Sequence, residues 1–316
     1  MSSANKREGI LLESGTNEVE IIEFYMRGQR FGVNVAKVKQ LIPFDASALS
    51  AMPKTPEAFR GVYLHRDTTI PMIDLGCALH LESLPEGETS PLLLICNFNM
   101  QTIAFAIDGV NRIHRMSWSD FSPLNPFLSN SCDSIIGSVN IDNHEILIID
   151  LEQIVAEYNP KVKAMYDGTE NEIAATDDVF DQHIFMAEDS TLIRAVLERD
   201  MKKAGFKNVR TFPNGKEALD AITAIAKKAQ LDNTGLKGIF DVLVTDIEMP
   251  LMDGLTLCRR IKKELQLQVP VLIYSSLINV EMSRKCQEVG ADAFFSKPHV
   301  DALVNSIKNR IKQLPQ

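Results

Sequence analysis

The chain lacks any apolar run as long as a membrane span requires. No stretch of its 316 residues approaches the roughly 18 consecutive apolar residues that are typical of a transmembrane helix. The first nine residues, MSSANKREG, are polar, so we expect neither a signal peptide nor a membrane anchor. The sequence therefore predicts a cytoplasmic protein that does not insert directly into the membrane.

Positive charge is also scarce, and the cysteines are not arranged in pairs. The 33 Lys and Arg are outnumbered by 42 Asp and Glu, which gives a net charge of −9. Because affinity for nucleic acid depends on clustered positive charge, we expect no nucleic-acid partner. The five cysteines are odd in number, widely separated and free of C-x-x-C spacing. They indicate reduced core thiols and exclude an obvious disulfide framework or zinc site.

What the chain does contain is enough apolar sequence for two domains. A hydrophobic fraction of 45% with 24% charged residues is typical of a globular protein, and the length suits two cores of ordinary size. Residues 161–181 are polar and acidic, with the runs GTENE and ATDD and no apolar periodicity, which indicates a linker. We therefore predict one domain over residues 1–160 and another over 182–316.

The first half shows repeated short strand patterns around polar turns. The predicted pairs are 21–25 with 31–35, the two halves of 61–75, 92–95 with 102–107, and 135–141 with 145–149. Such hairpins indicate an all-β domain of the barrel or sandwich type. After the first hairpin, the spacing of Val35, Val38, Leu41 and Ile42 predicts a short helix that Pro43 ends. No catalytic constellation is present in this half.

Several motifs occur in a recognisable order here. MPKTP is followed by G-x-x-L-x-R, IPMIDL, FAIDGV and IIGSVNIDNHEILIIDLEQI. This order resembles the CheW-like chemotaxis coupling domain. The resemblance implies paired small five-stranded barrels without catalytic activity, which bind the cytoplasmic tips of chemoreceptors and the histidine kinase CheA. Arg66 matches the family's receptor-proximal arginine, although Asp67 follows it where the family usually has Gly.

The second half changes to alternating strand and helix patterns. The expected strands are 183–187, 209–212, 240–244, 271–274 and 293–295, and the expected helices are 192–205, 216–229, 254–265, 280–289 and 300–314. Short connections between such elements predict a doubly wound, five-stranded parallel sheet covered on both faces.

Polar side chains follow the predicted strands of this sheet. Glu188 and Asp189 follow the first strand and Asp246 the third, and strand ends of a parallel sheet converge at one edge. Three carboxylates there repel one another unless a cation lies between them, and magnesium prefers oxygen ligands. Ser275 and Lys297 follow the fourth and fifth strands and suit phosphoryl oxygens. Taken alone, Asp246 could merely cap the next helix.

The motifs AEDS, VTDIEMP, YSS and FFSKP, in that order, resemble the receiver domain of two-component response regulators. The resemblance implies the following roles: Asp246 as phosphoacceptor, Asp189 as direct magnesium ligand, Glu188 as water-mediated acidic partner, Glu248 as backbone-carbonyl ligand, Ser275 as switch hydroxyl, Lys297 as phosphoryl-binding ammonium and Phe294 as aromatic switch. The side chains of Glu248 and Leu277 would line the route of attacking water. Phe294 replaces the commoner Tyr, and its alternative role is ordinary packing in the sheet.

A CheW-like domain followed by a receiver resembles the arrangement of the CheV chemotaxis coupling proteins. It implies a non-enzymatic adaptor at chemoreceptor arrays, regulated by phosphorylation of Asp246. The chain ends soon after the last predicted helix, so we expect output through the first domain or a partner. One alternative is a phosphate sink that drains the kinase. A phosphatase of the haloacid dehalogenase type is disfavoured, because that class needs a second Asp at position 248, where this chain has Glu before Pro250.

Overall fold

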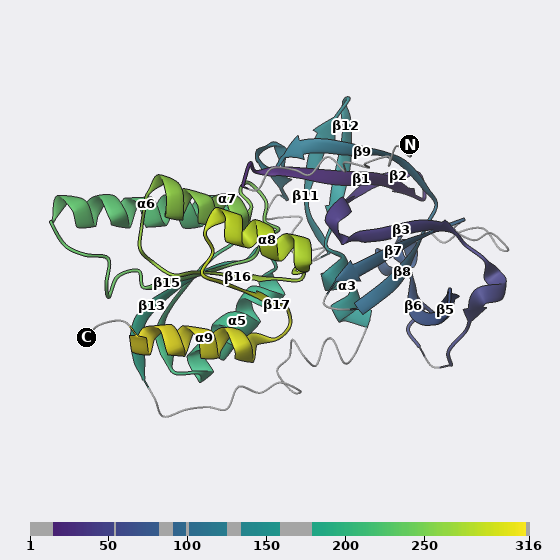
Figure 1. Cartoon of the computed structure of the whole chain (residues 1–316). Coiled ribbons are helices and arrows are strands. Elements are labelled where there is room, and N and C mark those ends of the chain that lie inside the picture. Colours follow the sequence, from purple (N-terminus) through teal and green to yellow (C-terminus); the bar gives the residue numbers. More distant parts are fainter. Residues whose placement is uncertain are drawn as a thin grey trace, which may run out of the picture.

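The computed structural model describes residues 15–53, 55–81, 91–98, 101–124, 134–158 and 179–313. Two domains lie side by side, an all-β domain drawn in purple to teal and an α/β domain drawn in green to yellow (Figure 1). Most of the predicted linker, together with Cys132, lies outside the described residues. Within them, none of the helices has the length and apolar character needed to cross a membrane.

The first domain contains two sheets. The first has the order β10-β11-β12-β2-β1-β9 and the second β3-β7-β8-β6-β5-β4. The strands are β1 (Glu18–Met26), β2 (Gln29–Asn34), β3 (Val38–Pro43), β4 (Leu49–Ser50), β5 (Phe59–His65), β6 (Thr68–Asp74), β7 (Leu92–Phe98), β8 (Gln101–Ile107), β9 (Gly109–Ser117), β10 (Ser122–Pro123), β11 (Ile135–Ile141) and β12 (His144–Ile149). Because β4 and β10 have two residues each, five longer strands remain in each sheet, as the predicted fold class requires.

All four predicted hairpins form, as β1/β2, β5/β6, β7/β8 and β11/β12. Short helical pieces complete the domain: η1 (Val35–Lys37), η2 (Ala46–Ala48), α1 (Leu75–Ala78), η3 (Trp118–Asp120) and α3 (Leu151–Tyr158). The helix α3 begins after Asp150, whose carboxylate accepts hydrogen bonds from the backbone N–H groups of Glu152 and Gln153. This cap holds Glu152 in the first turn of the helix.

The helix predicted from the spacing of Val35, Val38, Leu41 and Ile42 is wrong. Only Val35–Lys37 is helical, as a 3₁₀ turn, and Val38–Pro43 forms β3, which pairs antiparallel with β7. Along β3 partly buried and exposed residues alternate, the period of a strand with one face inward. Pairing with β7 satisfies the backbone and outweighs the helical spacing. The 3₁₀ turn leaves Lys37 buried.

The second domain is the predicted five-stranded parallel sheet, in the order β14-β13-β15-β16-β17. Its elements are β13 (Phe180–Ala187), α5 (Thr191–Lys203), β14 (Phe206–Phe212), α6 (Gly215–Leu231), β15 (Val242–Thr245), α7 (Gly254–Arg259), the π-helical η4 (Arg260–Glu264), β16 (Val271–Ser275), α8 (Val280–Val289), β17 (Ala293–Ser296) and α9 (Val300–Gln313). Helices α5 and α9 cover one face of the sheet, and α6, α7 and α8 cover the other (Figure 1).

The central strands are buried on both faces, which explains their continuous apolar sequences. Leu243 and Ile273 belong to the core on the α6–α8 side, whereas Val242 and Val244 belong to the other core. That second core also contains Ile154 of α3, so one apolar cluster includes side chains of both domains. The sheet therefore gives a rigid base to the loops at its carboxyl edge.

Candidate functional site

The carboxyl edge of the parallel sheet brings together residues that are far apart in sequence. Glu188 and Asp189 follow β13, Asp246 follows β15, and Lys297 follows β17. Ligand oxygens of the three acidic residues lie within 4.8 Å of one another. The predicted convergence of these strand ends is therefore present.

Lys297 lies between two of the carboxylates. Its Nζ is 2.7 Å from Oδ2 of Asp246, and 3.1 and 2.9 Å from Oε1 and Oε2 of Glu188. The residue is only 2% exposed. Burial alone would lower the pKa of Lys297, but attraction to Asp246 and Glu188 outweighs it and holds the pKa well above its ordinary value. Lys297 is therefore a fixed ammonium group beside the Asp246 carboxylate.

The acidic residues carry more negative charge than Lys297 balances. Burial raises the pKa of Glu188 well above its ordinary value, and the charges of Asp246 and Asp189 raise it further against the attraction of Lys297. Burial and the charge of Asp246 likewise raise the pKa of Asp189 well above its ordinary value. A divalent cation relieves such a surplus, and carboxylate oxygens are the ligands that magnesium prefers. The donor set therefore fits magnesium.

Ser275 and Phe294 lie on the neighbouring strands β16 and β17. Ser275 is fully buried, and its Oγ accepts a hydrogen bond from the backbone N–H of Leu277 at 3.4 Å. Phe294 pairs in register with Ile273 and packs against the core on the α6–α8 side. Neither is among the residues that line the pocket.

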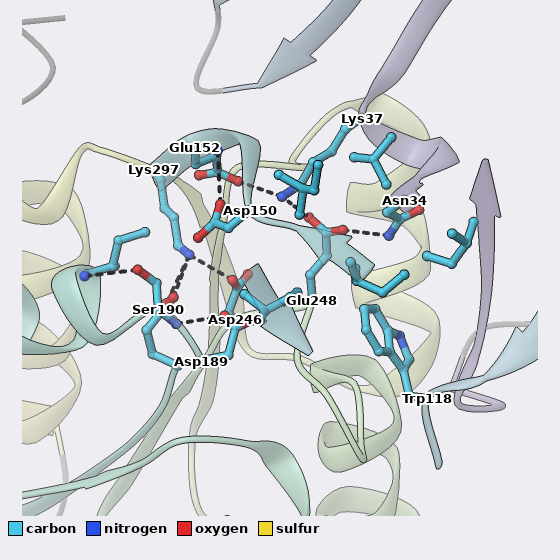
Figure 2. A pocket seen from close by; sticks show the side chains of 17 residues that line it. Asn34, Lys37, Trp118, Asp150, Glu152, Asp189, Ser190, Asp246, Glu248 and Lys297 are labelled. Atoms are coloured by element: carbon cyan, nitrogen blue, oxygen red, sulfur yellow. Dashed lines mark hydrogen bonds and ion pairs between the residues drawn. The ribbon is translucent and has the colours of Figure 1, made fainter. Parts of the chain in front are cut away.

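The all-β domain forms the opposite wall of this pocket. Five of its residues line the pocket opposite those of the α/β domain, and Figure 2 shows the two sets facing each other: Asn34, Lys37, Trp118, Asp150 and Glu152. Sequence analysis did not identify these five residues. The only sequence signal is the presence of charged residues within apolar segments, VNVAKV around Lys37 and ILIIDLEQIV around Asp150 and Glu152.

Lys37 joins the two walls. Its Nζ lies 3.0 Å from Oε2 of Glu248, in the α/β domain, and 3.0 Å from Oε1 of Glu152, in its own domain. Asn34 Nδ2 donates to Oε1 of Glu248 at 2.6 Å, and Ser276 Oγ donates to Oε1 of Glu152 at 2.6 Å. The side chain of Glu248, two residues after Asp246, is thus held by the other domain (Figure 2).

The charges of this cluster depend on one another. Burial would lower the pKa of Lys37, but Glu248, Glu152 and Asp150 together hold it well above its ordinary value. Burial opposes ionisation of Glu152, yet Lys37 and Lys297 lower its pKa to about 2. Glu248 contacts Lys37 equally closely, but burial and the charge of Asp246 raise its pKa. Lys37 is thus held in its charged form between two carboxyl groups, of which Glu152 ionises the more readily.

Four further hydrogen bonds join the domains around the pocket. They are Asn17 Nδ2 to the Leu251 carbonyl (3.1 Å), the Asp253 N–H to Asn17 Oδ1 (2.9 Å), the Leu251 N–H to the Trp118 carbonyl (3.1 Å) and Arg259 Nε to the Gly15 carbonyl (2.8 Å). Most of their partners in the α/β domain lie in the loop between Asp246 and α7. The β domain is thus fixed to the loop that carries Asp246.

Arg66 lies apart from this pocket. It is exposed in the turn between β5 and β6, with φ of +53°. Its Nη2 donates to Oε1 of Gln40 at 3.3 Å. The structure therefore leaves its guanidinium open to solvent at the surface of the second sheet.

Comparison with known proteins identifies both halves. Residues 20–159 match the CheW-like domain family, and residues 184–308 match the response regulator receiver domain family. The chain is similar to chemotaxis protein CheV3 of Helicobacter pylori, with 27% identity over 293 residues, 89% of this chain and 91% of that protein. Chemotaxis protein CheV2 of the same organism is 23% identical over 310 residues, 93% of this chain and 95% of that protein.

A solved structure also matches the receiver half. It is the receiver domain of the histidine kinase CKI1 from Arabidopsis thaliana, complexed with Mg²⁺ and BeF₃⁻. It shows 26% identity and a TM-score of 0.37, and the match covers 40% of this chain and 88% of that chain.

Proposed function

This chain belongs to the CheV type of chemotaxis coupling protein, a CheW-like domain followed by a receiver, and from that premise we propose that phosphorylation of Asp246 regulates its coupling of chemoreceptors to the histidine kinase CheA. The observation that carries this proposal is the shared pocket, in which the Asp246 loop and the coupling domain hold each other. A change of charge at Asp246 therefore acts on charged side chains of both domains.

The proposed reaction at Asp246 is a phosphoryl transfer. A carboxylate oxygen of Asp246 attacks the phosphorus of a phosphohistidine, the P–N bond breaks, and the imidazole nitrogen keeps the electron pair and takes a proton from solvent. The Lys297 ammonium, 2.7 Å from Asp246, binds the transferred oxygens. Glu188, Asp189 and Asp246, with the backbone carbonyl of Glu248, would hold a magnesium ion, which supplies positive charge beside those oxygens.

The phosphorylated side chain would carry about −1.5 to −2 charges at neutral pH, beside Glu188 and Asp189. The Ser275 hydroxyl then moves to donate to a phosphoryl oxygen, and Phe294 turns into the space that it leaves. Ser276 must move with Ser275, and Ser276 donates to Glu152 of the coupling domain. This provides a direct physical route from the phosphorylated aspartate to α3.

The coupling domain supplies the partner contacts in this proposal. Exposed Arg66 would pair with a carboxylate at a chemoreceptor tip, and strand edges of the domain would bind CheA. The protein would then act at the cytoplasmic receptor arrays as an adaptor, without catalytic turnover of its own. The runner-up is a phosphate sink, in which the receiver drains phosphoryl groups and the coupling domain only localises it. The contacts between Glu248 and the coupling domain favour the adaptor, since a sink needs none.

The test is CheA activity in reconstituted receptor–kinase complexes that contain this protein, either unphosphorylated or phosphorylated. The adaptor predicts that CheA activity differs between the two forms, and that the Asp246→Asn protein behaves as the unphosphorylated form under both conditions. Rapid phosphoryl turnover at Asp246 with unchanged specific activity of CheA would instead support the sink.

A further inference from the structure

We propose that the coupling domain is a lid over the phosphoacceptor pocket, held shut by the contact of Lys37 with Glu248, and that transfer from a protein donor to Asp246 takes place only when the domains separate. The inference rests on the proposed function, because it assumes that Asp246 receives the phosphoryl group. It adds a condition that the proposed function does not contain, namely that the arrangement described here accepts no phosphoryl group from a protein donor.

Access to Asp246 is the first observation. The residue is 6% exposed, and the cavity beside it has a volume of about 30 Å³, room for about two water molecules. A phosphohistidine must bring its phosphorus into contact with the Asp246 carboxylate, with the imidazole ring and the donor protein behind it. The side chains of Lys37, Asn34 and Trp118 line the wall of the pocket opposite Asp246, so the coupling domain stands where a docked donor protein would have to lie. Docking of the lid and docking of the donor are therefore mutually exclusive.

The chemistry of the contact is the second observation. Lys37 is 9% exposed and pairs with Glu248 and Glu152, both of which are buried. The intact ion pair adds little net free energy to docking, because loss of hydration offsets the attraction between the charges. Loss of Lys37 alone, however, leaves Glu248 and Glu152 buried without a cation and so disfavours the docked form. When the domains separate, Lys37 and Glu248 regain water. The ion pair therefore fixes how the coupling domain docks on the receiver, while the hydration regained on separation allows the domains to part.

Asn17 provides a second contact between the two domains, outside the pocket. Asn17 has a φ of +63°, and its side chain amide bonds both the Leu251 carbonyl and the Asp253 N–H of the receiver. Asn17→Gly removes the side chain and with it these two hydrogen bonds. The backbone conformation is preserved, because glycine adopts positive φ without strain. This substitution weakens the lid without changing any side chain that lines the pocket.

The experiment measures the initial rate of Asp246 labelling in the full-length protein, with phosphorylated CheA and, separately, with acetyl phosphate as donor. If the open form is populated at about 1–10%, Lys37→Met should raise the rate from CheA by up to roughly 10- to 100-fold. Acetyl phosphate is far smaller than CheA and needs only a partial separation of the domains to reach Asp246, so its rate should rise less. Lys39→Met removes the same charge from an exposed position two residues away and should leave both rates unchanged.

Opening can be followed separately through Trp118, the only tryptophan of the chain, which is 5% exposed at the junction. In Lys37→Met and Asn17→Gly its emission should shift to longer wavelength and become more accessible to acrylamide. Asn17→Gly should also speed labelling from CheA, by a smaller factor. This second variant decides the question if Lys37→Met does not fold.

Three outcomes overturn the lid: unchanged labelling from CheA in folded variants, equal gains with both donors in Lys37→Met, and exposure of Trp118 without faster labelling. Equal gains would mean that the loss of positive charge, rather than access, changed the rate. Failure of the proposed function would give a different result. In that case neither the wild type nor the variants would carry a label that depends on Asp246.

Discussion

The pocket contains two buried lysines that come from opposite walls. Lys297 follows a strand of the receiver and pairs with Glu188 and Asp246 of the same domain. Lys37 belongs to the coupling domain and pairs with Glu248 across the boundary as well as with Glu152. Opposing carboxylates keep the pKa of both lysines high despite burial. The first ion-pair cluster is part of one fold, whereas the Lys37–Glu248 contact of the second exists only while the domains are docked.

This difference suits the two tasks that we propose for the pocket, phosphoryl transfer and communication between the domains. Lys297 stays beside Asp246 whatever the coupling domain does, so it can serve the chemistry of phosphoryl transfer. Lys37 changes its partners when the domains separate, so it can serve the communication between them. Substitutions at the receiver cluster should therefore affect labelling and receiver stability, and substitutions at the junction should affect access and coupling.

The largest effect is expected at Asp246 itself. Asp246→Asn removes the nucleophilic carboxylate and should abolish labelling by phosphorylated CheA, as measured by radiolabel on the full-length protein. The substitution preserves size, so folding should be retained and is checked by circular dichroism. Acid-stable label on this variant would show that a different residue receives the phosphoryl group.

The next largest effect is expected on the stability of the receiver, which should depend on Lys297 much more than on Lys37. Lys297→Met leaves Glu188 and Asp246 buried without their cation, and should lower the free energy of unfolding of the receiver by about 3–5 kcal/mol in magnesium-free buffer. Denaturant titration of the full-length protein measures it. Lys37→Met is the matched control, because Glu188 and Asp246 keep Lys297, so its effect on receiver unfolding should be much smaller. Equal losses would show that the receiver depends on the lid for its stability.

The two lysines stay charged because carboxylates oppose the effect of burial. At the buried cysteines of both domains the effect of burial is the larger, so burial should keep their thiols neutral. Burial raises the pKa of Cys96, Cys258 and Cys286 to about 12. At pH 8 their thiolate fraction is then roughly a thousandfold below that of an exposed thiol. Of the four cysteines that the structure describes, the half-buried Cys77 should be alkylated by iodoacetamide first, as read by mass spectrometry, and the three buried thiols only as the pH approaches 12 or the protein unfolds.

The smallest effect is expected at Arg66, far from both lysines. Because an exposed ion pair contributes at most about 1 kcal/mol, Arg66→Glu should weaken binding to receptor–kinase complexes by roughly fivefold. Co-sedimentation with the complexes measures it. Arg112→Glu, an exposed arginine on β9 in the other sheet, is the control. Unchanged binding of a folded Arg66→Glu protein would make Arg66 an ordinary solvated turn residue.

The receiver wall of the pocket was predictable from sequence, and the other wall was not. Asp246, Asp189 and Lys297 each follow an apolar strand, and the topology of a parallel sheet places strand ends together. No comparable rule relates Lys37 in a 3₁₀ turn to Glu248, because their contact depends on how two domains dock. The same limit explains the missed strand β3, since its pairing with β7 outweighs the local spacing of Val35 to Ile42.

The most direct test of regulated coupling is the affinity of the protein for receptor–kinase complexes with and without beryllium fluoride, a phosphoryl mimic, in magnesium buffer. A coupling free energy of about 1–3 kcal/mol predicts that the mimic changes the affinity of wild type by roughly 5- to 150-fold. Phe294→Ala, which removes the proposed switch ring, should reduce that change, and Asp246→Asn should abolish it. Equal affinities with and without the mimic in wild type and in Phe294→Ala would contradict regulation through Asp246 and leave the phosphate sink.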